Sequence, residues 1–259
     1  MTASQTRIFP KNQFKQDLGR RQQIGLFSTL ASPLLAELLA GCGYDWLLID
    51  TEHSPNELPG VVEHLRALAM HGTAPIVRPA WSDMVLVKRL LDAGAQSLLF
   101  PYVQSAEEAE RAVSYTRFPP HGVRGVSGSS RAAQFGLIPD YFSQVAAELC
   151  VIVQIETGEA LEQLERIATV PGVDAVFIGP ADLAASLGHL GDNQHPTVQR
   201  AIDDAFRRLK AIGKPSGYLT ANEAEAKRRL ADGVDFVGVG TDTSVITRAA
   251  TALARDMRG

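Results

Sequence analysis

The stretch CVIVQIETGEALEQLERIATVPGVDAVFIGPADL, residues 150–183, decides the fold. Two short apolar runs, residues 151–155 and 175–178, flank an amphipathic segment at residues 160–169. This order predicts a strand, a helix and a second strand. Its length, about 30 residues, fits one parallel βαβ unit.

Both expected strands end close to a carboxylate. Glu156 closes the first, and a Gly-Pro pair leads from the second to Asp182. Neighbouring parallel strands point the same way and lie about 5 Å apart, so the two acids should converge at one end of the sheet. Paired carboxylates suit a hard divalent cation, and the sequence therefore predicts a Mg²⁺ or Mn²⁺ site at the mouth of a barrel.

Each acid has a simpler interpretation to weigh. Asp182 could instead cap the helix that follows it. Glu156 is a poor N-cap residue and ends a run so apolar that the strand should be buried on both faces. A charge placed there has to be paired or bound to a metal.

The composition is that of a soluble globular chain, with 45% hydrophobic and 21% charged residues in 259. A net charge of −4 gives no basic footprint, so nucleic acid is not an expected partner. Residues 1–22 lack the apolar core of a secretory signal, and no apolar run approaches the roughly 20 residues that span a bilayer. Cys42 and Cys150 are isolated, which is typical of free thiols in a reducing compartment, so the cytoplasm is the expected location.

Beyond a polar arm or short outer helix at residues 1–22, the chain alternates between strand and helix patterns. The expected strands are residues 24–27, 46–50, 75–78, 97–100, 151–156, 175–178, 215–219 and 236–240. The expected helices are residues 32–40, 58–70, 84–92, 106–116, 160–169, 182–187, 197–212, 221–231 and 243–258, with a further helix resuming near Tyr141.

Eight alternating units predict one closed α/β barrel, a (β/α)₈ TIM barrel, over residues 23–259. The alternative is an open doubly wound sheet, but no dinucleotide fingerprint follows the first strand. Residues 118–139 interrupt the rhythm with a long loop rich in Gly, Pro, Ser and Arg. Arg124 and Arg131 in this loop could reach an anionic substrate or a neighbouring subunit, or could simply be solvated.

Catalytic groups of such barrels cluster after the carboxyl ends of strands, and polar residues gather there in this chain. They are Asp50, Glu52 and His53 after the second strand, Arg78 at the end of the third, Gln154 and Glu156 in the fifth, and Asp182 after the sixth. Singly, a loop histidine or an arginine after a strand is more often structural. Together with a metal they suit a small oxo-acid.

The chemistry that these groups predict is enolate formation. The metal would chelate the carboxylate and keto oxygens, Arg78 would stabilise the developing oxyanion, and His53 would move the proton. The same enolate can attack an aldehyde, which is an aldol reaction. No lysine ends a strand, which disfavours a Schiff-base aldolase.

Five segments resemble one family: LLIDTEH (47–53), PIVRP (75–79), LLDAGAQSLLFPYVQ (90–104), QIET (154–157) and IGPADL (178–183). They are similar to segments of the class II pyruvate aldolases of the HpcH/HpaI type, which include 4-hydroxy-2-oxoheptanedioate and 2-dehydro-3-deoxyglucarate aldolases. The resemblance implies a phosphoenolpyruvate/pyruvate-type barrel and Mg²⁺, Mn²⁺ or Co²⁺ as cofactor. It also implies reversible cleavage of 4-hydroxy-2-oxo acids to pyruvate and an aldehyde.

The resemblance also implies roles for individual residues. Glu156 and Asp182 would bind the metal. Arg78, Gln154, Ala181 and Asp182 would contact pyruvate, and Arg78 would stabilise the transition state. His53 would be the proton acceptor, with Asp92 raising its basicity.

The role of Asp92 conflicts with the expected topology. Asp92 ends a helix, so it should lie at the end of its own barrel opposite to His53. A neighbouring subunit could supply the partner instead. The resemblance implies a hexamer, a dimer of trimers, in which the final helix is exchanged between neighbours.

Two other functions remain open. One is an acyl-CoA lyase of the citrate lyase β-subunit type, and the other is a non-catalytic barrel that binds oxo-acids. The segment GVGTDTS, residues 238–244, is a weak phosphate-cradle signal, and a tight turn with an Asp or Thr cap is the favoured interpretation. Leu219 and the loop at residues 118–139 are candidates to line the aldehyde pocket, whose preferred aldehyde the sequence does not predict.

Overall fold

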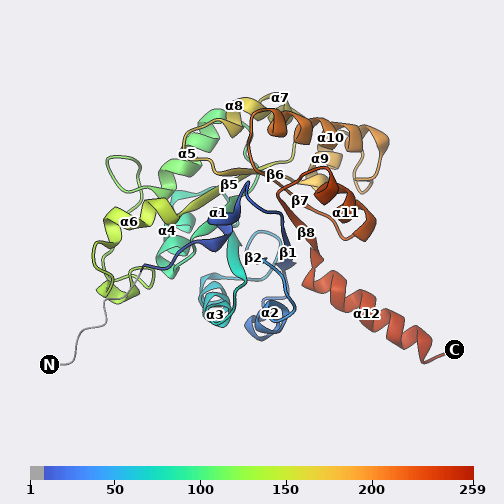
Figure 1. The fold of residues 1–259 in the computed structure, drawn as a ribbon, viewed down its shortest axis with the longest axis horizontal. Helices are drawn as coiled ribbons and strands as arrows, with labels where there is room; N and C mark the ends of the chain where they lie inside the picture. The colour runs from blue at the N-terminus through green and yellow to red at the C-terminus, as the bar shows by residue number, and fades with distance from the viewer. Residues whose placement is uncertain (1–8) are drawn as a thin grey trace.

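The computed structural model describes residues 9–259, which form a closed barrel of eight parallel strands surrounded by helices (Figure 1). Each strand pairs with its neighbours in sequence, and β1 closes the barrel against β8. The predicted (β/α)₈ barrel is therefore confirmed, and the open doubly wound sheet is excluded. The strands are β1 (Gln23–Ser28), β2 (Trp46–Asp50), β3 (Ala74–Arg78), β4 (Ser97–Phe100), β5 (Cys150–Ile155), β6 (Ala175–Ile178), β7 (Ser216–Leu219) and β8 (Phe236–Thr241).

The helices alternate with the strands as expected. They are α1 (Gln13–Asp17), α2 (Pro33–Ala40), α3 (Leu58–Leu68), α4 (Met84–Ala93), α5 (Ala106–Thr116), α6 (Tyr141–Glu148), α7 (Gly158–Glu162), α8 (Leu164–Ala168), α9 (Pro180–Ser186), α10 (Pro196–Ala211), α11 (Glu223–Ala231) and α12 (Asp242–Asp256), with a 3₁₀ turn at Gln134–Gly136. The single helix expected at residues 160–169 is two short helices, because Gln163 leaves the helical conformation between them. None of the described helices combines the length and the apolar composition of a membrane-spanning segment.

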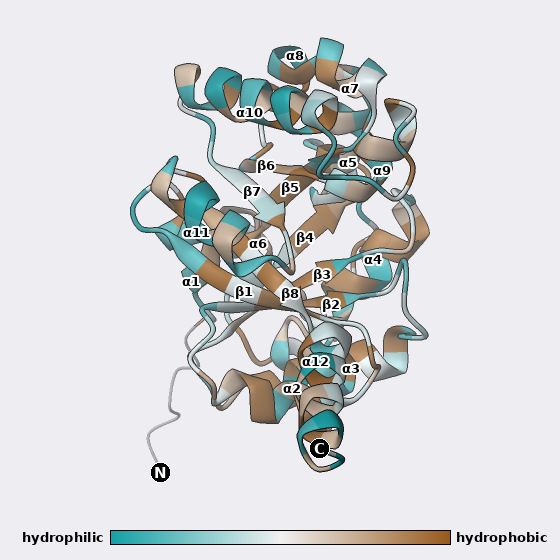
Figure 2. Cartoon of the chain, turned by 90° about the vertical axis from the view of Figure 1, so that its right-hand side faces the viewer, coloured by the Kyte–Doolittle hydropathy of each residue, from teal (hydrophilic) through white to brown (hydrophobic). Residues whose placement is uncertain are grey.

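Aromatic side chains fill the inside of the barrel. Trp46 and Phe236 are buried there with ring centroids 6.1 Å apart. Glycines make the space for them: a Cβ on Gly25 would lie 2.0 Å from the Trp46 ring, and one on Gly217 would lie 2.2 Å from the Phe236 ring. Figure 2 shows the apolar strands enclosed by helices whose outer faces are hydrophilic.

The N-terminal segment is more than an outer arm. The expected short helix is present as α1, but its Phe14 is fully buried and packs edge-on against Trp46 and Phe236. The prediction that this helix lies on the outside was wrong because a single aromatic residue in a polar segment carries no periodic signal. Phe14 closes the end of the barrel at which the strands begin. Residues 1–8 of the predicted arm lie outside the described residues.

The long segment at residues 118–139 is fastened to the side of the barrel. Arg124 is buried, and its Nη2 donates to Asp92 Oδ1 at 2.8 Å and to the Tyr141 hydroxyl at 3.2 Å. Arg131 donates to the carbonyl oxygen of Ala93 at 2.7 Å. Within the chain both arginines therefore bind the C-terminal end of α4. The alternatives of a solvated loop and of a lining for the chain's own barrel mouth were wrong.

The last helix projects away from the barrel (Figures 1 and 2). Three large apolar side chains on or just after it are exposed: Ile246, Leu253 and Met257. Both cysteines are free thiols, as the sequence predicts, with Cys42 exposed and Cys150 buried in β5.

Candidate active site

An arginine held by two carboxylates lies at the carboxyl ends of β2 and β3. Asp50 and Arg78 are direct neighbours in the register of these strands. The Arg78 guanidinium donates from Nε to Asp50 Oδ1 at 2.8 Å and from Nη2 to Asp50 Oδ2 at 2.7 Å. Its Nη1 lies 3.1 Å from Glu52 Oε2. This bidentate pairing fixes the plane of the guanidinium and leaves part of its N–H edge for another oxygen.

The sequence predicted Arg78 at this position but not its two partners. Asp50 is the last residue of the second strand and Glu52 follows it, yet only strand register places Asp50 beside Arg78. The sequence signal available for this pair was an acid at the end of one strand and an arginine at the end of the next.

Glu156 lies directly after β5 and is buried, with 2% of its surface exposed. Its Oε1 accepts a hydrogen bond from the Tyr102 amide at 2.8 Å, and its Oε2 accepts one from Gln154 Nε2. Burial is the largest cause that raises the pKa of Glu156, the two hydrogen bonds lower it, and the charges of Asp182 and Glu52 raise it. Together these effects raise the pKa to about 7.

A glycine beside Glu156 makes room for its carboxylate. A Cβ on Gly179 would lie 2.5 Å from Glu156 Oε2 and 3.0 Å from Gln154 Nε2. Gly179 follows β6, whose residue Phe177 pairs with Gln154 of β5. The Gly-Pro pair noted in the sequence therefore permits close approach of two strand ends.

Asp182 lies in the first turn of α9, close enough for its charge to raise the pKa of Glu156 and Glu52. The N-cap residue of α9 is Gly179, and no side chain caps this helix. The alternative prediction, in which Asp182 serves as the helix cap, was therefore wrong. Asp182 and Ala181 before it are exposed, whereas Glu156 is buried.

The donor set fits a divalent cation. Burial raises the pKa of Glu52 to about 7, the Arg78 charge opposes this, and the Asp50 and Asp182 charges add to it. The carboxylates of Asp50, Glu52 and Glu156 all act on the Arg78 guanidinium, and the side-chain amide oxygen of Gln154, Oε1, is buried without a hydrogen-bond partner. Among residues 9–259 no group of three or more His, Cys, Asp or Glu side chains forms a complete metal cage. A cation here would take a few protein oxygens and complete its shell with water or substrate, as Mg²⁺ commonly does.

His53 and Asp92 are not brought together within this chain. The His53 side chain is 65% exposed, and its Nε2 lies 3.8 Å from Glu52 Oε2. Asp92 forms an ion pair with Arg124 instead. The sequence had no signal for this ion pair because its residues lie 32 positions apart on different elements. A His53–Asp92 contact between subunits stays a prediction.

The turn after β8 contains a helix cap, as the sequence analysis favoured. Thr241 is the N-cap of α12, and its side chain accepts from the Ser244 amide at 3.0 Å. Asp242 accepts from the amides of Thr29, Leu30 and Thr243 at 2.9, 3.0 and 2.7 Å. Because these amides already donate to Asp242, they are not free to bind a phosphate.

Comparison with known proteins agrees with this geometry. Residues 23–249 match the family model described as HpcH/HpaI aldolase/citrate lyase. The chain is 54% identical over 245 residues to a 4-hydroxy-2-oxo-heptane-1,7-dioate aldolase of Klebsiella pneumoniae. The match covers 94% of this chain and 92% of the relative. It is 52% identical over 246 residues to a pyruvate aldolase of Rhizobium etli, covering 95% and 97% of the two chains.

A solved structure supports the same assignment. An HpcH/HpaI aldolase/citrate lyase family protein from Burkholderia cenocepacia superimposes with a TM-score of 0.94 at 42% identity, covering 96% of this chain and all of the other. The similarity therefore extends over the whole barrel.

Proposed function

Because the chain belongs to the HpcH/HpaI aldolase/citrate lyase family, we propose that it is a class II pyruvate aldolase that reversibly cleaves 4-hydroxy-2-oxo acids to pyruvate and an aldehyde. The observation that carries this proposal is the cluster of Glu156, Asp182 and Glu52 beside the clamped Arg78. Relatives named as aldolases at more than half identity favour it over an acyl-CoA lyase or a non-catalytic barrel.

Glu156 and Asp182 would hold a divalent cation, Mg²⁺, Mn²⁺ or Co²⁺, and Arg78, Gln154 and Ala181 would contact the oxo-acid beside it. The raised pKa of Glu156 supports this. Burial destabilises the charged carboxylate, and a bound cation would offset that cost. When bound, the cation supplies Lewis-acid polarisation of the substrate's keto group.

The protein's own residues would transfer the protons and stabilise the developing negative charge. In the cleavage direction His53 takes the proton of the 4-hydroxyl group, and the C3–C4 bond breaks as the aldehyde carbonyl forms. The bonding electrons move to the keto oxygen, where the Arg78 guanidinium stabilises the negative charge. A proton returned to C3 then gives pyruvate. Asp50 keeps the guanidinium aligned, and its bidentate contact supports that role.

We propose further that the protein works in the cytoplasm as a hexamer, a dimer of trimers. An exposed free thiol at Cys42 supports a reducing compartment. The apolar face of the projecting α12 supports exchange of this helix with a neighbouring subunit. In such an assembly a neighbour could bring Asp92 to His53.

A retro-aldol screen tests the activity. Protein treated with EDTA should release no pyruvate from 4-hydroxy-2-oxo acids, and Mg²⁺, Mn²⁺ or Co²⁺ should restore release. Glu156→Gln should stay inactive with every metal while keeping the melting temperature of the parent within a few degrees. Full activity without metal, or cleavage of malyl-CoA instead of the hydroxy-oxo acids, would refute the proposal.

A further inference from the structure

The two residues that follow Glu156, Thr157 and Gly158, are hydrogen-bonded from both sides of the candidate site. The Thr157 hydroxyl donates at 2.5 Å to Gln104 Oε1, which belongs to the connection after β4. The Gly158 amide donates at 3.0 Å to the hydroxyl of Ser186, the last residue of α9. The end of β5 is therefore joined to the connection after β4 on one side and to α9 on the other.

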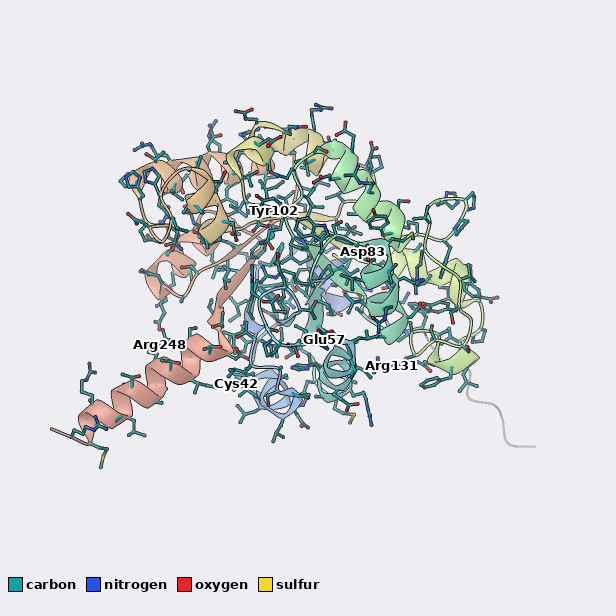
Figure 3. The ribbon with its side chains drawn as sticks, turned by 180° about the vertical axis from the view of Figure 1, so that it is seen from behind. Cys42, Glu57, Asp83, Tyr102, Arg131 and Arg248 are labelled. Carbon is teal, nitrogen blue, oxygen red and sulfur yellow. The ribbon has the colours of Figure 1, made fainter. Side chains whose placement is uncertain are left out.

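The connection after β4 supplies the amide that orients the Glu156 carboxylate. The Tyr102 amide donates to Glu156 Oε1 at 2.8 Å, and the next amide, of Val103, donates to the carbonyl oxygen of Gln154 at 3.1 Å. Tyr102 has a φ of 55°, a conformation that a non-glycine residue adopts rarely and at a cost. Figure 3 shows Tyr102 over the barrel, apart from Arg248 on the projecting α12. Because the contact with Glu156 comes from the backbone, it depends on how this connection is held and not on the Tyr102 ring.

Gln104 holds the connection at two points. Its amide donates to Glu108 Oε2 at 2.9 Å in the first turn of α5, and its side-chain oxygen accepts from the Thr157 hydroxyl. The same hydroxyl accepts at 3.1 Å from the Ala160 amide, because Thr157 is the N-cap residue of α7. Thr157 is buried, and donating one way while accepting the other fixes the direction of its hydroxyl.

Ser186 connects the end of β5 to the helix that carries Asp182. It lies four residues after Asp182, so the two side chains lie on the same face of α9. Gly158 is the first residue of α7, where an amide has no acceptor within its own helix. The Ser186 hydroxyl is the acceptor for this amide, and the contact fixes α9 two residues along the chain from Glu156.

From these contacts we infer that a polar brace holds the two proposed metal ligands, Glu156 and Asp182, in a fixed relative position. The brace consists of the side chains of Gln104, Thr157 and Ser186. The inference rests on the proposed metal-dependent function and assigns positioning residues to that same site. Gln104 and Thr157 keep the loop amide on the Glu156 carboxylate, and Ser186 keeps α9 against the end of β5. The brace acts through the two carboxylates and does not itself bind the cation.

Binding of Mn²⁺ to the protein without substrate, measured by isothermal titration calorimetry, tests this inference. Gln104→Met and Ser186→Ala each remove one hydrogen bond of the brace and leave the N-cap of α7 in place. Thr157→Val removes the hydroxyl at nearly constant size, whereas Thr157→Ser keeps it and serves as the rescue. The electron paramagnetic resonance spectrum of bound Mn²⁺ and the melting temperature are recorded for every variant.

Two matched controls make the same substitutions elsewhere. Gln96→Met changes a glutamine that lies just before β4, at the opposite end of that strand from Gln104, and that donates to the Pro10 carbonyl at 2.8 Å. Ser143→Ala removes an exposed helical hydroxyl that donates at 2.8 Å to the carbonyl of Asp140, the N-cap residue of α6. Neither control residue contacts the connection after β4 or α9 through a hydrogen bond.

We expect Gln104→Met and Ser186→Ala each to weaken Mn²⁺ affinity about tenfold, as the loss of a partner behind a metal ligand predicts. Thr157→Val should weaken it at least as much. The resonance spectrum of bound Mn²⁺ should change in all three variants, because the ligand arrangement is no longer fixed. Thr157→Ser and both controls should match the parent in affinity and spectrum, and the melting temperatures should stay within a few degrees.

Other outcomes overturn the inference. Affinity like that of the parent in either Gln104→Met or Ser186→Ala would do so, as would an equal loss in the controls or no rescue by Thr157→Ser. Weaker binding that only follows a large fall in melting temperature would assign these residues to general stability. A parent that binds no Mn²⁺ and releases no pyruvate would remove the proposed function, and the brace with it. A parent that binds Mn²⁺ no better than the three variants would remove the brace alone.

Discussion

Asp50 is the residue on which the orientation of Arg78 depends most. Replacing it with alanine removes both bidentate contacts and leaves a guanidinium that is 9% exposed with only Glu52 beside it. Because a buried guanidinium that loses its bidentate partner is left incompletely paired, Asp50→Ala should lower the free energy of unfolding by about 3 kcal/mol. It should also reduce kcat for pyruvate release.

Glu57→Ala is the control for this prediction, since Glu57 lies in the same connection and its side chain makes no capping hydrogen bond. Urea denaturation of the three proteins measures the difference. Equal midpoints for Asp50→Ala and the parent would show that Asp50 does not stabilise Arg78.

Gly179 should be intolerant of even one added carbon. In Gly179→Ala the new Cβ would lie 2.5 Å from Glu156 Oε2, so the carboxylate or the strand end has to move. Displacing a proposed ligand by this much should weaken metal affinity about tenfold to a hundredfold. Isothermal titration with Mn²⁺ measures it. Gly72→Ala is the matched control, because nothing lies within 4 Å of a Cβ there, and unchanged affinity in both variants would contradict the prediction.

The candidate site was predictable where one residue closes one apolar run. Arg78 and Glu156 were found this way, because burial of a strand constrains the polar residue that ends it. The contacts of Asp92 were not predictable, since its pairing with Arg124 depends on how a long segment folds against α4. Local periodicity contains no information about such ion pairs.

Among the elements, the N-terminal segment is held in part by Glu148, the acid at the end of α6. Glu148 accepts from Lys11 Nζ at 2.7 Å and from the Asn12 amide at 2.9 Å. Burial alone would raise the pKa of Glu148, but these two hydrogen bonds outweigh it and hold the pKa below its ordinary value. The stabilisation from Glu148 is therefore present above the unfolded-state pKa, about 4.3, and is lost as the pH falls through the lower folded-state pKa.

The pH dependence of Glu148→Gln tests this contribution. At pH 7 the variant should melt a few degrees below the parent, and the gap should close as the pH falls below about 4. Differential scanning calorimetry at several pH values measures both proteins. A gap that stays constant across this range would show that the carboxylate charge does not hold the segment.

The boundaries of several elements agree with the sequence prediction because their limits are set locally. Ser105 caps α5, whose bounds were predicted at residues 106–116. The position of α1 was missed for the opposite reason. Its burial depends on Trp46 and Phe236, which reach the same space from distant strands.

At the scale of the whole molecule, α12 is the element left without a full set of neighbours. If it packs on another subunit, a charge on its apolar face should break the assembly. Leu253→Glu should lower the native mass measured by analytical ultracentrifugation from that of the proposed hexamer. Thr251→Glu adds the same charge at an exposed position off this face and should leave the mass unchanged. A monomeric parent would contradict the hexamer itself.

Phe14 closes the end of the barrel at which the strands begin, and this has a kinetic consequence. Reactants and products can enter and leave only at the opposite end, where the strands finish. In the proposed site pyruvate would lie innermost, so it should bind first in condensation and leave last in cleavage. Cleavage should thus follow an ordered sequence in which pyruvate inhibits competitively against the hydroxy-oxo acid, whereas the aldehyde inhibits noncompetitively.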